Sequence, residues 1–212
     1  SRHGQLDCAR DGFTATPLAD GTILIVGGYA GAMQRLASVE IYDPRKRRSQ
    51  AITPMSLPRM AHTATRLADG RVLIAGGTVV RNRPVATLLL YDPGTRTFRD
   101  AGVLAKARHK HAAVLRGDEV LIIGGAGTEE YDSQFAETEI WNARTGAVRP
   151  GPRLADARYK IVDAVAVLVN GDVLVAGSSP VPEILPARGN AFRALAGRLD
   201  ARAPADGARR QG

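Results

Sequence analysis

The 212-residue sequence predicts an all-β fold made of four copies of a four-stranded antiparallel unit. Three features support this prediction. The chain repeats with a period of about 49 residues, which falls in the range of repeated β units. Each copy holds a short apolar run that ends in a pair of small residues. A second repeated position, which we call the second anchor, follows further along and is aromatic in the first three copies. An arginine precedes each copy, at Arg10, Arg59, Arg108 and Arg158.

The first two strands of each copy are predicted from alternation, a turn and an apolar run. In the second copy, small and polar residues alternate from His62, the turn is Asp69-Gly70, and residues 72–75 are continuously apolar. Asp-Gly is a strong hairpin signal, and a short apolar run suits a strand covered on both faces. The equivalent apolar runs are 23–26, 120–123 and 173–176.

The last two strands form around the second anchor. The third strand ends at Tyr42, Tyr91 and Trp141 in the first three copies, and a tight turn and a short fourth strand follow. The fourth copy departs from the pattern, because Leu185 replaces the aromatic residue and Gly177-Ser178 replaces the glycine pair. The first copy departs at Ser49, where the last strand lacks an aromatic residue.

Composition excludes several classes of protein. The net charge is +8, but aromatic residues make up only 5% of the chain, so the stacking platforms of nucleic-acid binding are not expected. The single cysteine, Cys8, cannot form an internal disulfide framework. No apolar run reaches the length of a membrane span, and the chain begins Ser-Arg-His-Gly without a secretory segment. We therefore expect neither a nucleic-acid nor a membrane partner.

The glycine pairs and aromatic anchors at this period resemble the kelch repeat, most closely that of bacterial kelch and galactose-oxidase-like central domains. The resemblance covers residues 9 to about 195. It implies a β-propeller whose blades have their first strand innermost, in an extracellular or periplasmic protein. The expected propeller spans 9–198 and is followed by a disordered tail at 199–212. The expected blades are 10–57, 58–106, 107–154 and 155–198.

Four blades are too few for the six or seven of a closed kelch ring, so an open arc is expected. The ends of an arc expose apolar sheet, because a blade buries its faces only against its neighbours. We interpret the chain as a fragment or truncated product of a longer propeller. The alternative is self-association that completes a ring.

The resemblance places the loops between strands two and three, and the inter-blade segments, on one face. The loops at 29–37, 78–86 and 126–137 are the longest and least alike, and variable loops on a rigid scaffold carry binding. The expected function is a binding scaffold for a protein or carbohydrate. The third loop adds acidic charge at Glu129, Glu130, Asp132 and Glu137, and Lys106 adds basic charge. The basic turn at 45–48 is expected on the opposite face. The candidate ligand-binding residues are Arg35, Arg59, Arg81, Arg83, Arg108, Lys110 and Arg158.

Two sets of repeated residues have a structural and a functional interpretation. The arginines at the start of each blade either tie neighbouring blades together through loop carbonyls or contact ligand. His62 and His111 occupy equivalent positions, which Phe13 and Asp163 fill in the flanking copies. His109 and His111 would share one side of a strand and form a metal pair, but packing is the favoured interpretation and no metal or cofactor is expected.

The alternative function is part of a galactose-oxidase-like or sialate-epimerase-like enzyme whose site lies mostly outside this chain. The oxidase chemistry needs a tyrosine crosslinked to a cysteine, and no repeat places Cys8 near His109 or His111. We expect a binding protein rather than an enzyme.

Overall fold

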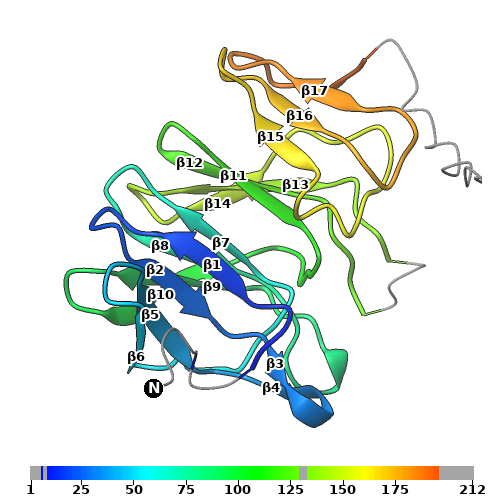
Figure 1. Ribbon diagram of the computed structural model, residues 1–212. Helices are drawn as coiled ribbons and strands as arrows, with labels where there is room; N and C mark the ends of the chain where they lie inside the picture. Colours follow the sequence, from blue (N-terminus) through cyan, green and yellow to red (C-terminus); the bar gives the residue numbers. More distant parts are fainter. Residues whose placement is uncertain (1–5, 7–8, 129–132, 196–212) are drawn as a thin grey trace, which may run out of the picture.

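The computed structural model describes residue 6, residues 9–128 and residues 133–195. Within them the chain forms four separate four-stranded antiparallel sheets, which confirms the all-β prediction (Figure 1). Blade 1 consists of β1 (Thr14–Pro17), β2 (Ile23–Val26), β5 (Val39–Asp43) and β6 (Arg48–Ile52). Blade 2 consists of β7 (Thr63–Arg66), β8 (Val72–Ala75), β9 (Thr87–Asp92) and β10 (Thr97–Val103). Blade 3 consists of β11 (Ala112–Arg116), β12 (Glu119–Ile123), β13 (Thr138–Asn142) and β14 (Val148–Pro150). Blade 4 consists of β15 (Val165–Val167), β16 (Val173–Val175), β17 (Glu183–Leu185) and β18 (Arg193–Ala194).

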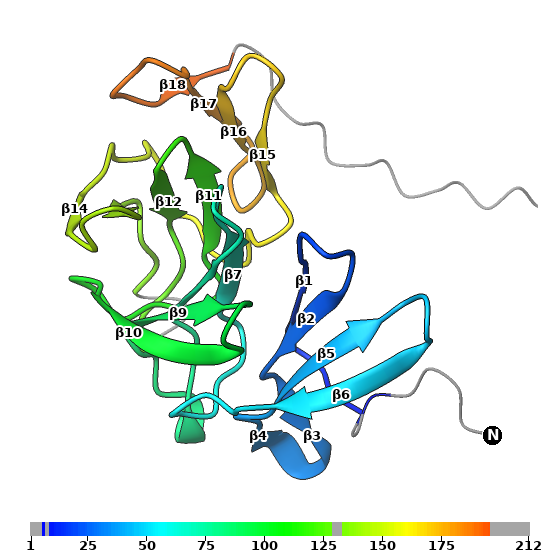
Figure 2. The same cartoon turned by 90° about the vertical axis from the view of Figure 1, so that its left-hand side faces the viewer.

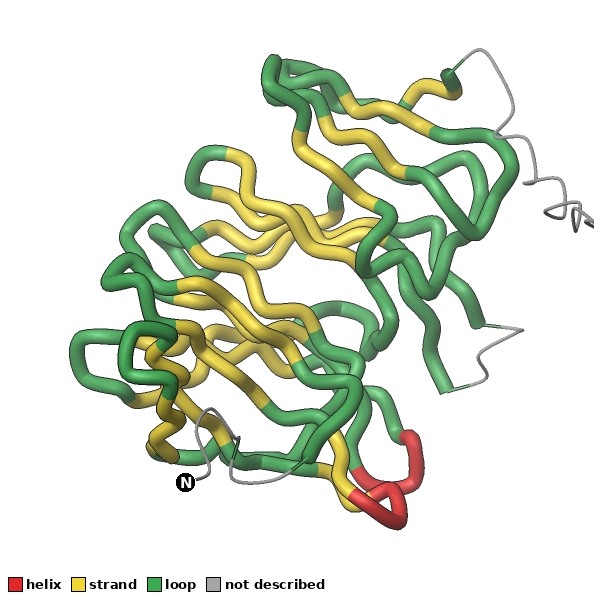
Figure 3. The backbone as a smooth tube through the Cα atoms, viewed as in Figure 1, coloured by secondary structure: helices red, strands yellow, loops and turns green. Residues whose placement is uncertain are grey.

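In the part of the chain that the structure describes, helical structure is limited to two short 3₁₀ turns in the loops after the second strands (Figure 3). They are η1 (Gly31–Met33), which lies between the short strands β3 (Tyr29–Ala30) and β4 (Gln34–Arg35), and η2 (Val80–Asn82). No helix within the described ranges is long and apolar enough to cross a membrane.

The four sheets are arranged as blades around a common centre. The first strands β1, β7, β11 and β15 lie innermost and each contacts the next, whereas β6, β10, β14 and β18 lie at the periphery (Figure 2). Blades 1 and 4 form the two ends of the arc, and the described sheets do not close into a ring (Figure 2).

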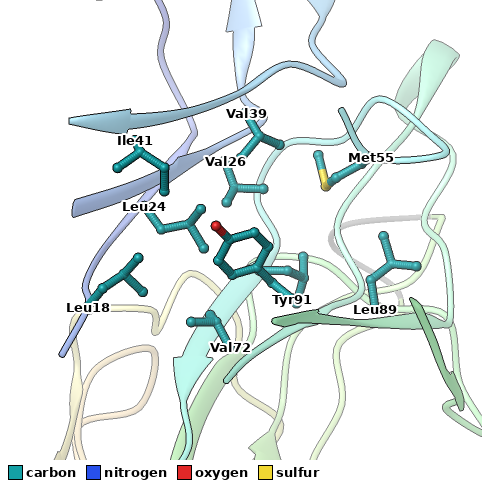
Figure 4. Packing of buried hydrophobic residues seen from close by; sticks show 10 residues of the cluster. Leu18, Leu24, Val26, Val39, Ile41, Met55, Val72, Leu89 and Tyr91 are labelled. Atoms are coloured by element: carbon teal, nitrogen blue, oxygen red, sulfur yellow. The ribbon is translucent and has the colours of Figure 1, made fainter. Parts of the chain in front are cut away.

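Apolar residues fill each of the three interfaces between consecutive blades. Between blades 1 and 2, Leu24 and Val26 on one sheet pack with Val72 and Tyr91 on the next (Figure 4). Between blades 2 and 3, the indole of Trp141 is buried and its Nε1 donates to the carbonyl of Ala101, 2.8 Å away. The continuous apolar second strands are therefore explained by burial on both faces.

Blade 4 differs from the sequence alignment at the start of its inner strand. The residue three positions after the arginine approaches the first glycine of the preceding blade, as His62 and His111 do. In blade 4 that residue is Ile161, which is fully buried, whereas Asp163 is exposed. The expectation that Asp163 fills the histidine position is therefore wrong, because residues 162–163 form an added turn before β15.

The connections define two faces. We call the side that carries the loops between second and third strands and the inter-blade segments the loop face, and the opposite side, with the tight hairpin turns, the turn face. Arg35 donates to the side chain of Asn82, which joins two neighbouring loops on the loop face. On the turn face, Gly21 and Arg45 are neighbours. The basic segment 45–48 thus lies away from the loop face, as expected.

Candidate functional site

The repeated arginines lie inside the arc. The side chains of Arg59, Arg108 and Arg158 are fully buried. Each guanidinium donates to the carbonyl of the first glycine of its own blade: Arg59 to Gly76 at 3.0 Å, Arg108 to Gly124 at 2.7 Å and Arg158 to Gly177 at 2.8 Å. Arg10 makes the same bond to Gly27 at 3.1 Å.

The backbones of the same arginines belong to the preceding blade. The carbonyl of Arg59 accepts a hydrogen bond from the N–H of Gly28 in blade 1, at 2.8 Å. The carbonyls of Arg108 and Arg158 accept from Gly77 and Gly125 at 2.9 and 2.7 Å. Arg59, Arg108 and Arg158 therefore each bond two consecutive blades at once, and the interpretation that these residues tie neighbouring blades together is confirmed.

The glycine pairs are required by this contact. A Cβ on Gly76 would lie 2.4 Å from the carbonyl oxygen of Arg108, and a Cβ on Gly27 would lie 2.5 Å from that of Arg59. Gly76 also has a φ of +59°, which disfavours any larger residue. The first glycine is thus the point at which the next blade approaches.

Three of the four arginines have a buried carboxylate partner. Arg10 pairs with Glu40, Arg108 with Glu139 and Arg158 with Glu183. These glutamates are not among the predicted site residues. The signal that could have found them is their repeated place, two residues before Tyr42, Trp141 and Leu185. Blade 2 has Leu89 at that position, so Arg59 donates instead to the carbonyl and hydroxyl of Thr87.

Burial and pairing together set the protonation of these groups. Desolvation lowers the pKa of Arg59 to about 10. Desolvation also lowers the pKa of Arg108, although Glu139 acts in the opposite direction. A buried cation is stable here because every blade supplies carbonyl acceptors to it.

Burial removes three residues from the predicted ligand surface. Arg59, Arg108 and Arg158 have no exposed side-chain surface, and their guanidinium groups bond to the protein itself. The expectation that they contact ligand is corrected for this reason.

The two repeated histidines link the inner strands. The Nε2 of His62 lies 2.9 Å from the hydroxyl of Thr14 in blade 1, and the Nε2 of His111 lies 2.9 Å from the hydroxyl of Thr63 in blade 2. At the next interface an apolar pair, Ala112 and Ile161, takes these positions. Desolvation lowers the pKa of His62 to about 3 and that of His111 well below its ordinary value, so both rings are neutral at pH 7.

His109 and His111 do not share a strand. Lys110 between them has a φ of +53°, and β11 begins only at Ala112. The expected one-sided arrangement is therefore wrong. No group of three or more histidine, cysteine, aspartate or glutamate residues is placed to hold a metal ion within the described ranges. Cys8 lies outside them.

The remaining predicted residues lie on the loop face. Arg35 and Arg81 line one shallow groove together with Gln34, Val80 and Asn82. Arg35 also lies over the ring of Tyr29, with 5.8 Å from its guanidinium carbon to the ring centroid. Arg83 is exposed and directly follows Asn82 in the chain, and Lys110 is half-buried on an inter-blade segment.

The exposed basic residues of the loop face differ in how far they are engaged. Lys106 and Arg153 both pair with Glu137, at 3.0 and 2.8 Å. Although partial burial acts to raise it, these hydrogen bonds lower the pKa of Glu137 to about 2. Arg81 and Arg83, by contrast, make no side-chain hydrogen bond or ion pair with any described residue, and are therefore available to a partner. The predicted acidic residues Glu129, Glu130 and Asp132 lie outside the described residues.

Comparison with known proteins identifies the repeat. Residues 13–56 match the family model described as the kelch motif. The fold is a kelch-type propeller arc. The match covers blade 1, and blades 2 to 4 repeat its strand order. No curated protein matches the chain. Kelch repeats generally form protein-binding scaffolds.

Proposed function

We propose that the chain binds an acidic segment of a partner protein through the loop face of blades 1 and 2. The observation that carries this proposal is the groove between the two loops. Its lining combines Arg35 and Arg81 with Val80, a residue that is 62% exposed. The exposed Arg83 directly follows Asn82 of the lining in the chain.

The chemistry of the groove favours a protein segment with both acidic and apolar side chains. The guanidinium groups of Arg81 and Arg83 would form charge-assisted hydrogen bonds with carboxylates. Val80 would contact an apolar side chain between them. The hydrogen bond from Arg35 to Asn82 supports the proposal because it holds the two loops in one arrangement before a partner arrives.

Selection from a random peptide library tests the proposal. The full chain is immobilised, bound peptides are enriched, and their affinities are measured by fluorescence polarisation. We expect acidic peptides with at least one large apolar residue. The double charge reversal R81E/R83E should weaken their binding at least about tenfold, since each lost charge-assisted hydrogen bond contributes about 1.5–3 kcal/mol.

The matched control reverses two exposed arginines on the turn face, R45E/R47E. It changes the net charge by the same amount and should leave the affinity nearly unchanged. Peptides without acidic bias, or an equal effect of the two double variants, would refute the assignment to this groove. Carbohydrate binding and the oxidase-like or epimerase-like alternative stay predictions.

A further inference from the structure

A cavity of about 580 Å³ opens on the turn face between blades 3 and 4. Leu121, Ile140 and Val167 line its apolar part, and Arg116, Arg149 and Arg188 line its rim. Its size falls within the range of small-molecule sites. It lies on the opposite face from the groove of the proposed function, so it is an independent site.

The apolar part of the cavity follows from the departure at Leu185. At the preceding interface, Trp141 occupies the equivalent position and reaches across blade 2 to donate to Ala101. Leu185 pairs with Val173 as Trp141 pairs with Val120, so the two positions correspond. Leucine is shorter and has no donor, and the face of blade 3 at Ile140 is left to line the cavity.

One difference at the rim concerns the arginine on the last hairpin turn, which has a carboxylate partner at the equivalent place between blades 2 and 3. There, Arg144 on the last hairpin turn of blade 3 pairs with Asp118, at 2.5 Å. Arg188 stands at the equivalent position of blade 4, three residues after Leu185. Gly171 takes the place of Asp118, so Arg188 loses its carboxylate, and it makes no hydrogen bond or ion pair with any described residue.

The other two rim arginines are engaged and fix the geometry. Arg116 donates to the carbonyls of Pro186 and Ala187 at 3.0 and 2.7 Å, which holds the turn that carries Arg188. Arg149 pairs with both carboxylate oxygens of Glu119, at 3.0 and 2.9 Å. The lining therefore carries three cations and one anion, with one guanidinium left uncommitted.

We propose that this cavity binds a small organic monoanion, an aromatic or alicyclic carboxylate. Its ring would lie against Leu121, Ile140 and Val167. The ring would thus take the place that the indole of Trp141 fills at the preceding interface. Its carboxylate would accept hydrogen bonds from Arg188, whose planar guanidinium matches a carboxylate in bidentate geometry. Two departures of blade 4, the loss of the aromatic side chain and the loss of the acidic partner, thus combine in one site.

Isothermal titration of the full chain with 2-naphthoate and with the uncharged 2-naphthamide tests the proposal. We expect naphthoate to bind with one site per chain and more tightly than the amide. R188Q should weaken naphthoate about tenfold and leave the amide unchanged, because only the charged interaction is lost. The matched control R144Q alters the equivalent arginine of blade 3 and should change neither affinity.

A second variant tests the apolar part. L185W should reduce binding of both probes, because the indole fills the cavity, while thermal unfolding shows that the chain remains folded. R188Q decides the matter if L185W does not fold. The proposal is overturned by absence of naphthoate binding, by equal affinities of the two probes, or by equal effects of R188Q and R144Q.

Discussion

Replacing Arg108 by methionine should destabilise the arc far more than the same change at Arg59. Both side chains are fully buried and both bond to the first glycine of their own blade. Only Arg108 also pairs with a buried carboxylate, Glu139, at 2.6 Å. The two variants therefore differ mainly in whether a buried anion loses its cation.

The expected magnitudes follow from these contacts. R59M removes the arginine donor to the carbonyl of Gly76 and one of the two donors to the carbonyl of Thr87, which costs about 1–3 kcal/mol, and it removes a cation whose burial is itself unfavourable. R108M leaves Glu139 buried without its cation, and breaking a buried pair costs about 3–5 kcal/mol. The difference between the two variants should be about 2 kcal/mol.

Urea unfolding followed by the fluorescence of Trp141 provides the assay, because this residue is the single tryptophan and is buried between blades 2 and 3. The double variant R108M/E139Q completes a cycle with the two single variants. It should be more stable than R108M alone, since no buried charge remains. Equal losses for R59M and R108M, or a double variant no more stable than R108M, would refute the assigned role of the carboxylate.

Three further predictions concern the interfaces. Gly76→Ala should lower the free energy of unfolding, measured by thermal unfolding, by at least about 2 kcal/mol more than Gly117→Ala does. Both glycines have a positive φ, of +59° and +58°, but only at Gly76 would the added Cβ meet a neighbouring carbonyl. Thr63→Val should cost about 1–3 kcal/mol by leaving Nε2 of His111 unpaired, and T63A/H111I should recover part of that loss, since an apolar pair serves the next interface. Burial lowers the pKa of His62 in the folded chain to about 3, below its ordinary value of 6.5. The contribution of the neutral ring to the free energy of unfolding is therefore fully present above pH 6.5 and is lost as the pH falls toward 3. H62F should flatten the profile of stability against pH in this range by about 1.4 kcal/mol per pH unit.

The sequence predicted those features that repeat. The period, the strand order and the linking role of the arginines could be inferred because the same residue types return at the same spacing. The sequence could not distinguish an exposed arginine from a buried one, because the burial of Arg108 depends on the fold of two blades. The assignment of Asp163 to the histidine position of blade 4 is wrong because residues 162–163 add a turn that alignment of the repeats does not show. The departure at Leu185 was visible, but its consequence depends on which surface Trp141 covers one interface earlier.

Because an arginine at a blade junction bonds to two blades, the unit that unfolds together does not coincide with the sequence repeat. A cut just before Arg59 would separate this residue from blade 1, whose Gly28 bonds to its carbonyl, although its side chain belongs to blade 2. A cut just after it would leave a cation on blade 1 without its acceptors. Neither place yields two self-sufficient halves, so adjacent blades should unfold as coupled neighbours rather than as independent modules.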